Sequence, residues 1–296
     1  MNFLISGGTG FVGTKLAARL KQEDHHIFIL TRSPEAHQND EHTTFIHTDE
    51  LTDELPAMEG VINLAGESLF GYWSEKKKKE IIDSRLLMTD KLVKFMSKMP
   101  AKPKAFISAS AVGYYGTSED LIYTEETKQA GEDFLAIVAK KWENAAERAV
   151  SLDIRTIFVR FGVILGEKGA LPMMALPVKL FAGGKIGNGE QWISWIHVDD
   201  VVEIIIYCLF HSHMKGPVNA TAPQPLRNMD FMKLLARSLK RPFWSTVPSR
   251  LFSLAAGEVS QLVLQGQYVL PKKLTEYGYT FQHAALSEAL DNIYHT

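Results

Sequence analysis

The sequence is poor in cysteine, in long apolar runs and in excess charge of either sign. Its single cysteine, Cys208, excludes a disulfide within the chain and makes a reducing compartment, the cytoplasm, the expected location. The longest strongly apolar segment, Val201 to Phe210, is interrupted by Glu203 and is far shorter than the roughly 20 residues that a membrane span needs. Its 32 basic and 34 acidic side chains leave a net charge of -2, which argues against broad binding to nucleic acid. We expect a globular monomer or homodimer that binds a small molecule and has no membrane or nucleic-acid partner.

Apolar strands alternate with helices through the first 165 residues. A strand at 2–6, a glycine-rich turn, a helix at 14–22 and a strand at 27–30 form one β-α-β unit. The alternation continues with strands at 61–65, 104–108 and 154–161 and with long helices at 75–99 and 131–151. This order predicts an α/β fold of the Rossmann type, in which helices cover both faces of a doubly wound parallel sheet.

Glycines at positions 7, 10 and 13 lie between the first strand and the first helix. Gly7 permits a tight turn, Gly10 lets a pyrophosphate approach the backbone, and Gly13 allows the helix to pack closely on the strand. The helix N-terminus then supplies amide donors and a favourable dipole for an anion. The spacing, in its strand and helix context, favours dinucleotide binding over a merely structural turn. The predicted contacts in this loop are Gly7, Thr9, Gly10, Phe11, Val12 and Gly13.

A carboxylate that would bind the ribose hydroxyls of NAD is missing from the end of the second strand. The strand ends instead in Leu30-Thr31-Arg32-Ser33-Pro34. The guanidinium of Arg32 is suited to a 2'-phosphate, and Ser33 lies beside it in the sequence. The missing carboxylate and Arg32 together predict NADP(H) as the cofactor. The alternative is that Arg32 is simply a surface residue.

Regular alternation ends near residue 165, where Gly, Pro and Trp gather between Gly166 and Trp195. The chain is expected to return to the sheet for a helix after Asp199 and a strand near Val218. We therefore predict two bodies: an NADP-binding Rossmann domain of residues 1–165 and 197–220, and a smaller, mostly helical C-terminal substrate lobe of residues 166–196 and 221–296.

Two local patterns concern helix N-termini. Residues Asp200 to Glu203 have the spacing of a capping box, and Asp199 competes with Asp200 as the cap. The run Lys76 to Lys79 opposes the dipole of the helix it begins, and we expect it to form a solvated face.

Four motifs together carry a family resemblance: the three glycines, Asn63-Leu64-Ala65-Gly66, Ser108-Ala109-Ser110, and the segment Trp195 to Asp200. With them the chain resembles an extended short-chain dehydrogenase/reductase. Further stretches make it similar to the bacterial "epimerase family" proteins, an atypical branch with a eukaryotic member: Trp73 to Arg85, Asp133 to Leu135, Gly187 to Asp200, Asn219 to Pro223, and Leu270-Pro271. The similarity covers essentially the whole chain. It implies a Rossmann fold that binds NADP(H), a family-specific C-terminal segment, and further cofactor contacts at Leu64, Ala65, Gly66, Arg85, Ser108 and Ala109.

The catalytic pair that is usual in that superfamily is absent. It consists of a Tyr and a Lys four residues apart on the helix after the serine strand, where the Tyr transfers a proton and the Lys lowers its pKa. Only Tyr72 with Lys76 and Tyr268 with Lys272 have this spacing, and neither pair lies on that helix. The helix at 131–151 contains no Tyr.

Catalysis would therefore depend on other groups. We expect Ser110 to polarise the substrate oxygen through its hydroxyl, and the proton to come from Tyr114, Tyr115, Glu67 or water. This predicts an NADP(H)-dependent oxidoreductase that acts on a small carbonyl or alcohol and needs no metal. The alternative is a catalytically silent protein whose affinity for a partner changes with the state of the cofactor.

A second departure from the family pattern concerns the substrate. The arginine that clamps the diphosphate in nucleotide-sugar epimerases is replaced by Ile193, which cannot bind phosphate. We therefore do not expect a nucleotide sugar. Trp192 and Trp195 flank this position, so an apolar or flat substrate is predicted to contact Trp192, Ile193 and Trp195, with core packing of the two tryptophans as the alternative. We expect His197 to support the loop and the helix after it rather than act as an acid or base.

Overall fold

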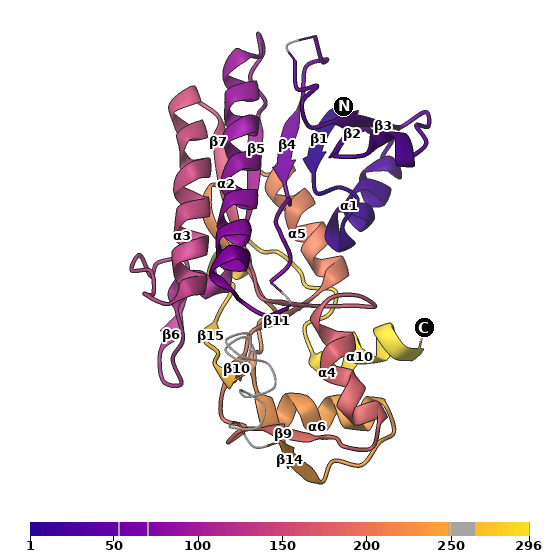
Figure 1. The fold of residues 1–296 in the computed structure, drawn as a ribbon, viewed down its shortest axis with the longest axis vertical. Helices are drawn as coiled ribbons and strands as arrows, with labels where there is room; N and C mark the ends of the chain where they lie inside the picture. Colours follow the sequence, from indigo (N-terminus) through magenta and orange to yellow (C-terminus); the bar gives the residue numbers. More distant parts are fainter. Residues whose placement is uncertain (53, 70, 248, 250–263, 296) are drawn as a thin grey trace.

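The fold is built on one parallel sheet of seven strands in the order β12-β7-β5-β4-β1-β2-β3 (Figure 1). The computed structural model describes residues 1–295 except 53, 70, 248 and 250–263. The strands are β1 (Asn2–Ser6), β2 (His26–Thr31), β3 (Thr43–His47), β4 (Gly60–Asn63), β5 (Ala105–Ala111), β7 (Arg155–Phe161) and β12 (Gly216–Ala220). From β1 the sheet extends through β2 and β3 on one side and through β4, β5, β7 and β12 on the other. This confirms the predicted doubly wound α/β fold.

Helices cover both faces of the sheet. They are α1 (Phe11–Lys21) and α5 (Val198–Phe210) on one face, and α2 (Glu75–Lys98) and α3 (Phe134–Glu147) on the other. The first strand shows how the sequence specifies this arrangement. Phe3 and Ile5 pack in the core with α1 and α5, whereas Leu4 packs in the core with α2 and α3. Because successive side chains of a strand point to opposite faces, a strand covered on both sides is apolar throughout.

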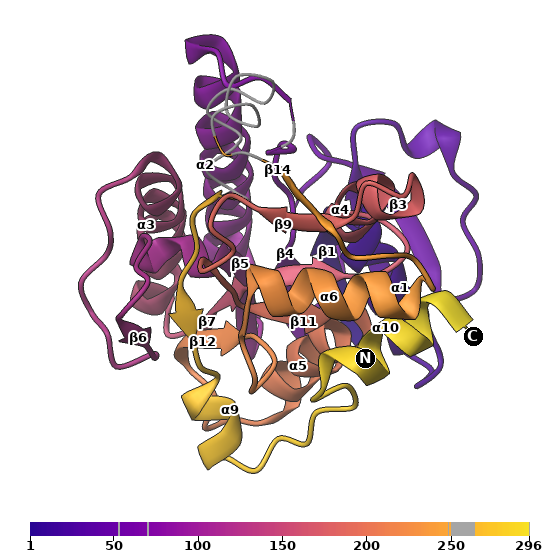
Figure 2. The ribbon, with the colours of Figure 1, turned by 90° about the horizontal axis from the view of Figure 1, so that it is seen from below.

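A second lobe lies beyond the carboxyl edge of the sheet (Figures 1 and 2). Its helices are α4 (Ala170–Lys179), α6 (Asn228–Ser238) and α10 (Leu286–His295), and α6 contacts α10 along its length. Its short strand pairs are β8 (Val163–Leu165) with β11 (Trp195–His197), β9 (Gly184–Ile186) with β14 (Ser245–Val247), and β10 (Trp192–Ile193) with β13 (Leu226–Arg227). The core of this lobe includes Leu171, Val178, Trp195 and Phe231. The C-terminal part of the chain is thus largely helical, as predicted.

The C-terminal segment contacts both parts of the molecule. Strand β15 (Tyr268–Val269) pairs with β6 (Ile122–Tyr123), and α9 (Lys272–Glu276) lies against β12. Leu274 joins the core that α1 and α5 form with the sheet. The sequence-based division assigned the whole of 221–296 to the second lobe, so this packing crosses the predicted boundary.

Several element ends differ from the sequence-based prediction. Strand β3 was not predicted, α1 begins at Phe11 rather than Thr14, and β4 ends at Asn63 rather than Ala65. The three remaining short elements are 3-10 turns: η1 (Pro34–Ala36), η2 (Val112–Tyr115) and η3 (Arg148–Leu152). Within the described ranges, no helix combines the length and the apolar character that crossing a bilayer requires.

The predicted cap of α5 was wrong. His197 is the N-cap, and its Nδ1 accepts a hydrogen bond from the amide of Asp199 at 3.2 Å. Asp200 is fully buried and accepts hydrogen bonds from the amides of Gln282 and His283, at 2.8 and 2.9 Å. The expected supporting role of His197 is thus confirmed, while Asp200 fastens the C-terminal segment to α5.

The lysine run at the start of α2 is only partly a solvated face. The side chains of Lys76 and Lys79 are 87% and 76% exposed, as predicted. Lys77 instead reaches the carboxylate of Glu67, with its Nζ 2.6 Å from Oε1. Its ammonium therefore belongs to the edge of the candidate site.

Candidate functional site

The glycine-rich turn joins β1 to α1 at the carboxyl edge of the sheet. Gly7 has a φ of +73°, which glycine adopts without strain. A Cβ at Gly13 would lie 2.2 Å from the carbonyl oxygen of Gly7, so only glycine lets α1 pack this closely on the turn. In the first turn of α1, the first backbone amide that donates a hydrogen bond is that of Thr14, to the carbonyl oxygen of Gly10. No side chain caps the N-terminus of α1. The amides of the first helical turn are therefore available to an anion.

The end of β4 meets this turn directly. A Cβ at Gly7 would lie 2.7 Å from the carbonyl group of Leu64, so the two loops touch. Buried Asn63 holds them together: its Oδ1 accepts from Ser6 Oγ at 2.6 Å, and its Nδ2 donates to Thr89 Oγ1 at 2.9 Å. Two of the predicted cofactor segments, the glycine turn and Leu64 to Gly66, thus form one surface.

Arg32 follows β2 on the other side of the glycine turn. Its side chain is exposed and forms no hydrogen bond or ion pair with any residue of the described ranges. Ser33 is exposed beside it, and its amide donates to Thr31 Oγ1 at 3.3 Å. Arg32 is thus sterically available for the predicted 2'-phosphate contact.

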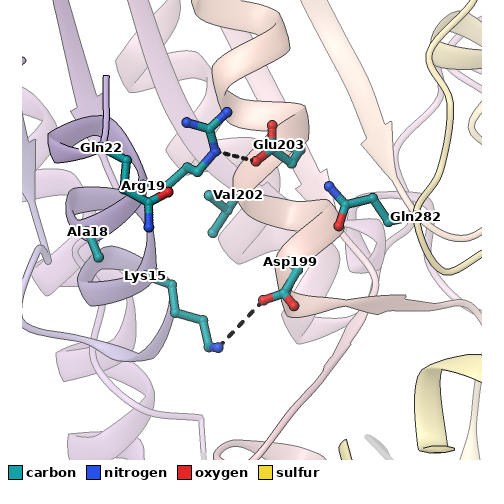
Figure 3. A pocket seen from close by; sticks show the side chains of 8 residues that line it. All are labelled: Lys15, Ala18, Arg19, Gln22, Asp199, Val202, Glu203 and Gln282. Carbon is teal, nitrogen blue, oxygen red and sulfur yellow. Dashed lines mark hydrogen bonds and ion pairs between the residues drawn. The ribbon is translucent and has the colours of Figure 1, made fainter. Parts of the chain in front are cut away.

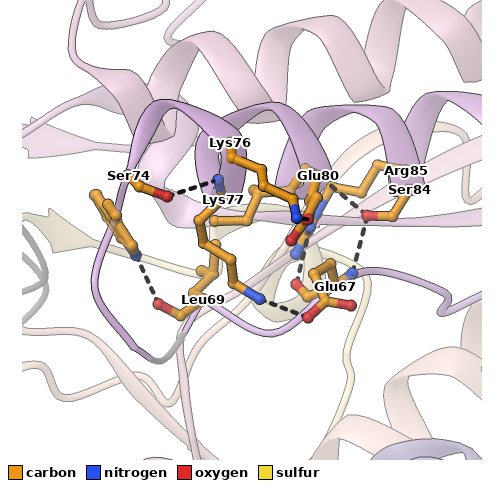
Figure 4. A network of polar contacts seen from close by, with 10 residues as sticks. Glu67, Leu69, Ser74, Lys76, Lys77, Glu80, Ser84 and Arg85 are labelled. Atoms are coloured by element: carbon orange, nitrogen blue, oxygen red, sulfur yellow. Dashed lines mark hydrogen bonds and ion pairs between the residues drawn. The ribbon is translucent and has the colours of Figure 1, made fainter.

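Glu67 lies between positively charged side chains (Figure 4). The hydrogen bond from Lys77, together with the charges of Lys77 and Arg32, holds the pKa of Glu67 below its usual value. Its amide donates to Ser84 Oγ at 3.0 Å, and its carbonyl oxygen accepts from Arg85 Nη1 at 3.1 Å. Glu67 is therefore ionised at neutral pH and can accept a proton but has none to donate.

The serine strand ends in a buried network that the sequence did not predict. Ser110 Oγ donates to Glu143 Oε1 at 2.6 Å, and Arg160 binds both oxygens of Glu143 at 2.8 Å. Burial opposes the charge of Arg160, but its hydrogen bonds to Glu143, the negative charge of Glu143 and the contact with Tyr115 together outweigh burial and raise the pKa of Arg160. The only hydroxyl proton of Ser110 is committed to a carboxylate. Ser110 therefore presents lone pairs rather than the donor that the sequence analysis expected.

The two tyrosines after β5 lie against the same network. The ring of Tyr114 stacks on Arg160, with the guanidinium carbon 3.6 Å from the ring centroid, and its hydroxyl donates to the carbonyl of Lys128 at 3.0 Å. Tyr115 is buried, and its hydroxyl donates to Asn219 Oδ1 at 2.7 Å. Burial raises the pKa of Tyr115 to about 12. Tyr114, which is partly exposed, is the more accessible of these two candidate donors.

Ser108 and Ala109 precede Ser110 on β5. Ser108 is fully buried and Ala109 nearly so, and Ser108 Oγ lies 3.3 Å from the carbonyl oxygen of Ala109. Ser108 also pairs with Asn63 of β4 across the sheet. The two predicted cofactor contacts on β5 are thus placed next to the β4 loop.

The predicted substrate tryptophans differ in their surroundings. Trp195 has no exposed surface, and its indole nitrogen donates to the carbonyl of Gln224, so the core-packing alternative describes it. Ile193 is 8% exposed and belongs to the same core. Trp192 is partly exposed, but Arg227 stacks on its ring with 3.8 Å between guanidinium carbon and ring centroid. Core packing therefore describes Trp195 and Ile193, and substrate contact at these three positions stays a prediction that the partly exposed Trp192 fits best.

A charged groove of about 360 Å³ lies between α1 and α5 (Figure 3). Two ion pairs cross it: Arg19 with Glu203 at 2.7 Å and Lys15 with Asp199 at 3.5 Å. These contacts fasten the two helices together. The groove therefore has a structural explanation.

Three residues near the site were not singled out from the sequence: Trp142, Glu143 and Arg160. Glu143 interrupts the apolar face of α3, and Arg160 interrupts the apolar run of β7. A charge at a buried position must find a partner, so these two positions together carried a usable signal. Trp142 carried no comparable signal.

Comparison with known proteins places this geometry in context. The chain matches the model of the NAD dependent epimerase/dehydratase family over residues 3–220 and a domain of unknown function, DUF1731, over residues 247–293. "Epimerase family protein YfhF" of Bacillus subtilis is 43% identical over 99% of this chain and 98% of that protein. The crystal structure of human epimerase family protein SDR39U1 (isoform 2) with NADPH has a TM-score of 0.91 at 32% identity, covering 100% of both chains. A nucleoside-diphosphate sugar epimerase from Corynebacterium glutamicum has a TM-score of 0.76 at 31% identity, over 99% of this chain and 58% of that one.

Proposed function

The chain belongs to the NAD dependent epimerase/dehydratase family, and we propose that it binds NADP(H) and acts as an oxidoreductase on a small carbonyl or alcohol. The observation that carries the cofactor proposal is the uncapped N-terminus of α1, reached through a turn that only glycine at positions 7 and 13 can form. Backbone amides aimed at one point, together with the helix dipole, suit a pyrophosphate.

The preference for NADP(H) over NAD(H) rests on Arg32. It lies at the end of β2, where the adenosine ribose binds in this fold, and none of the three residues that follow the strand, Arg32, Ser33 and Pro34, is acidic and able to accept the ribose hydroxyls. The structure of the human relative with NADPH supports the same choice. In this proposal Ser33 and Arg32 hold the 2'-phosphate.

The bound cofactor would supply or accept the hydride, and the chain must then manage the proton. Because Ser110 donates to Glu143, it can accept a hydrogen bond from a substrate hydroxyl but cannot polarise a carbonyl by donation. Of the two tyrosines, Tyr114 has the hydroxyl that is not buried, and it can donate to a substrate once it releases the carbonyl of Lys128; water is the other source of the proton. Glu67, being ionised, would act as a base in the direction of alcohol oxidation.

A nucleotide sugar is not part of this proposal. Ile193, in place of a diphosphate-binding arginine, lies in an apolar core and offers no charge. The relative from Corynebacterium glutamicum carries a sugar-epimerase name, so direct binding measurements must decide between the two substrate classes.

A second candidate is a catalytically silent protein that responds to NADP(H). The observation in its favour is that the hydroxyls of Ser110, Tyr114 and Tyr115 all donate to acceptors within the chain. Such a protein would bind the cofactor and leave it unchanged. The single cysteine, Cys208, is buried in the core. Both proposed functions are therefore compatible with a reducing compartment such as the cytoplasm.

The deciding experiment combines binding with turnover. NADPH is first titrated calorimetrically, and its oxidation is then followed with a panel of small aldehydes, ketones and oxo acids. Binding followed by consumption with any substrate supports the oxidoreductase, and the variants Ser110→Ala and Tyr114→Phe then separate the proton-handling groups. Binding without consumption across the panel favours the silent protein, and no binding rejects both.

A further inference from the structure

Helix α4 of the second lobe leaves an apolar face uncovered. Lys179 is the only polar side chain of this helix, and a helix that is apolar all round is normally buried on every side. The residues of α4 that pack in the core of the lobe are Leu171, Ala175 and Val178. Three exposed residues, spaced by three and then four positions and therefore on one face, are Met173, Leu176 and the C-cap residue Leu180. The lobe thus buries one side of α4 and exposes another that is equally apolar.

Phe181 and Trp244 extend this face at the end of α4. The indole nitrogen of Trp244 donates to the carbonyl oxygen of Phe181 at 3.0 Å, and its amide donates to that of Gly183 at 3.1 Å. The side chains of Met173, Leu176, Leu180, Phe181 and Trp244 are between 55% and 73% exposed, and we call these five residues the apolar patch. Strands β9 and β14 follow Phe181 and Trp244 closely in the chain, and both lie at the end of the second lobe that is farthest from the sheet (Figure 1). The patch therefore reaches the tip of the lobe.

Phe181 occupies a strained position. Its φ of +62° lies in the left-handed region, which glycine usually adopts where a helix ends and which is unfavourable for a bulky side chain. Because its ring is mostly exposed, packing within the chain does little to offset this strain. Strain of this kind is typical of residues that have a function. An aromatic ring is thus presented to solvent at a position where glycine would suit the backbone better.

Positive charges border the apolar patch. Residues 168–189 and 231–247, which contain the patch, include seven basic side chains and no Asp or Glu. Lys179 and Arg241 lie over aromatic rings, those of Tyr294 at 5.3 Å and Phe181 at 4.5 Å. Neither of them, nor Lys240, forms an ion pair with any residue that the structure describes. These three side chains are therefore cations without a carboxylate partner in the described part of the chain.

This lack of partners is not general for the surface. Lysines on other elements that have a carboxylate oxygen within 2.8 Å include Lys21, Lys91 and Lys104. Asp291 on α10 lines a groove together with Lys240, yet it forms no ion pair with a described residue. A positively charged tip on a chain whose net charge is -2 indicates an anionic partner.

The combination of apolar and positive side chains identifies the kind of partner. A symmetric contact with a second copy of the chain would bring the cations of one patch close to those of the other, which is unfavourable. Nucleic acid would match the charge, but it offers no apolar medium for exposed methionine and leucine side chains. A bilayer with anionic lipids matches both features, because aromatic and aliphatic side chains enter the boundary between headgroups and acyl chains while Lys and Arg bind the headgroups.

We propose that the apolar patch, together with Lys179, Lys240 and Arg241, binds the second lobe to the surface of a membrane that contains anionic lipids. The five apolar side chains enter the headgroup boundary, and the three cations remain at the level of the lipid phosphates. Binding of this kind needs no spanning helix, and it replaces the sequence-based expectation that the chain has no membrane partner. It also does not depend on cofactor binding, so it goes beyond the proposed function.

The test is co-sedimentation of the full chain with lipid vesicles. One set of vesicles is phosphatidylcholine alone, and the other is an equimolar mixture of phosphatidylcholine and phosphatidylserine. Wild type should bind the anionic vesicles at least about tenfold more tightly, because each basic side chain near such a surface strengthens binding by about fivefold. Raising the ionic strength from about 0.1 to about 1 M shortens the Debye length from about 10 to about 3 Å and should weaken the binding.

The role of the cations is tested by a triple variant. Replacement of Lys179, Lys240 and Arg241 by Gln should weaken binding to anionic vesicles by about a hundredfold. The matched control carries Lys94→Gln, Lys140→Gln and Lys141→Gln, which remove three exposed positive charges from α2 and α3. Because the control has the same net charge as the variant, its vesicle affinity should stay within about threefold of wild type if the position of the charges matters.

The role of the apolar patch is tested by Leu180→Gln combined with Phe181→Gly. This variant should bind anionic vesicles at least about tenfold more weakly, because it removes apolar side chains that enter the lipid. Its fold should persist, since both side chains are exposed and glycine suits the positive φ. The matched control is Leu87→Gln with Ile137→Gln, which removes exposed apolar side chains from α2 and α3. Thermal unfolding checks that all variants remain folded.

Four results would overturn the proposal. They are the absence of vesicle binding by wild type, equal binding to both kinds of vesicle, unchanged binding by the folded patch variants, and equal losses in the patch variants and their controls. Sedimentation velocity without vesicles gives a further check. A wild-type dimer that Leu180→Gln with Phe181→Gly dissociates would make the patch a contact between two copies of the chain instead of a membrane surface.

Discussion

Ser110 on β5 donates its hydroxyl proton to Glu143 on α3 across 2.6 Å. The same carboxylate is held by Arg160 from β7, so three elements meet at one buried ion pair. The helix that carries a Tyr and a Lys in the wider superfamily, and that lacks the pair in this chain, thus contributes a carboxylate to the serine strand. Because a hydroxyl has only one proton, this contact leaves Ser110 able to accept a hydrogen bond from a substrate but not to donate one.

The ion pair itself should be important for stability. Glu143→Gln would leave Arg160 buried without a negative charge, which should lower the free energy of unfolding by about 3 to 5 kcal/mol. The double variant Glu143→Gln with Arg160→Met removes the stranded charge and should recover part of the loss. Urea unfolding of the three proteins measures this. A loss below about 1 kcal/mol in the single variant would show that the network is not important for the fold.

Cofactor preference should depend on Arg32. Wild type should bind NADPH about tenfold to a hundredfold more tightly than NADH, because one charge-assisted contact contributes about 1.5 to 3 kcal/mol. Arg32→Ala should bring the two affinities together by weakening only NADPH. Fluorescence titration with both cofactors is sufficient, and equal affinities in wild type would contradict the assignment.

Two glycines of the turn should respond differently to a side chain. Gly10 has an extended backbone, and a Cβ there would meet only the oxygen of Gly7 at 3.2 Å. Gly10→Val should therefore fold but fail to bind NADPH, because the side chain covers the surface that the pyrophosphate needs. Gly13→Val is the contrasting variant: its Cβ would overlap the backbone, and the protein should be destabilised. Circular dichroism and cofactor titration distinguish them, and NADPH binding by folded Gly10→Val would make Gly10 a purely structural glycine.

Nucleotide sugars should not bind. Ile193 lies in an apolar core where a diphosphate would have no partner. Calorimetry with UDP-glucose and NADPH-saturated protein should give no detectable heat of binding. Tight binding would show that another cation of the second lobe replaces the missing arginine.

Stability should fall in mild acid because of His197. Burial, followed by the neighbouring His283, lowers its pKa to about 4, while Asp199, Lys15 and Glu167 also face it. In the unfolded chain its pKa is about 6.5, so the unfolded state takes up a proton first as the pH drops. The contribution of His197 is complete above pH 6.5 and is lost progressively down to about pH 4, amounting to as much as about 3 kcal/mol.

The matched variant for this effect is His197→Asn. Asparagine can also accept the amide of Asp199 as a helix cap but does not titrate. Urea unfolding at several pH values should therefore show a smaller decline for His197→Asn than for wild type between pH 6.5 and 4. Parallel declines in the two proteins would place the acid sensitivity elsewhere.

The sequence was sufficient to predict features that depend on residues close together along the chain. Apolar runs predicted the central strands, and glycine spacing predicted the turn, since both follow from local backbone geometry. The same reasoning could not show that His197 caps α5 in place of two acidic neighbours, because a histidine ring acts as a cap only in a particular rotamer. It also could not bring Ser110, Glu143 and Arg160 together, because those residues are distant in the sequence and meet only through sheet order. Contacts across elements therefore account for most of what was missed.

The position of β1 in the interior of the sheet, between β4 and β2, also has a consequence for synthesis of the chain. Each new strand joins an outer edge, and β7 is bordered by β5 on one side and by β12 on the other. The 54 residues between Phe161 and Gly216 must be made before β12 can cover β7. At about 5 to 20 residues per second this takes roughly 3 to 11 s, during which β7 offers an unpaired apolar edge on the nascent chain. Ribosome stalling in this interval would leave a template for aggregation, whereas stalling after β12 has emerged from the ribosome would let all seven strands pair.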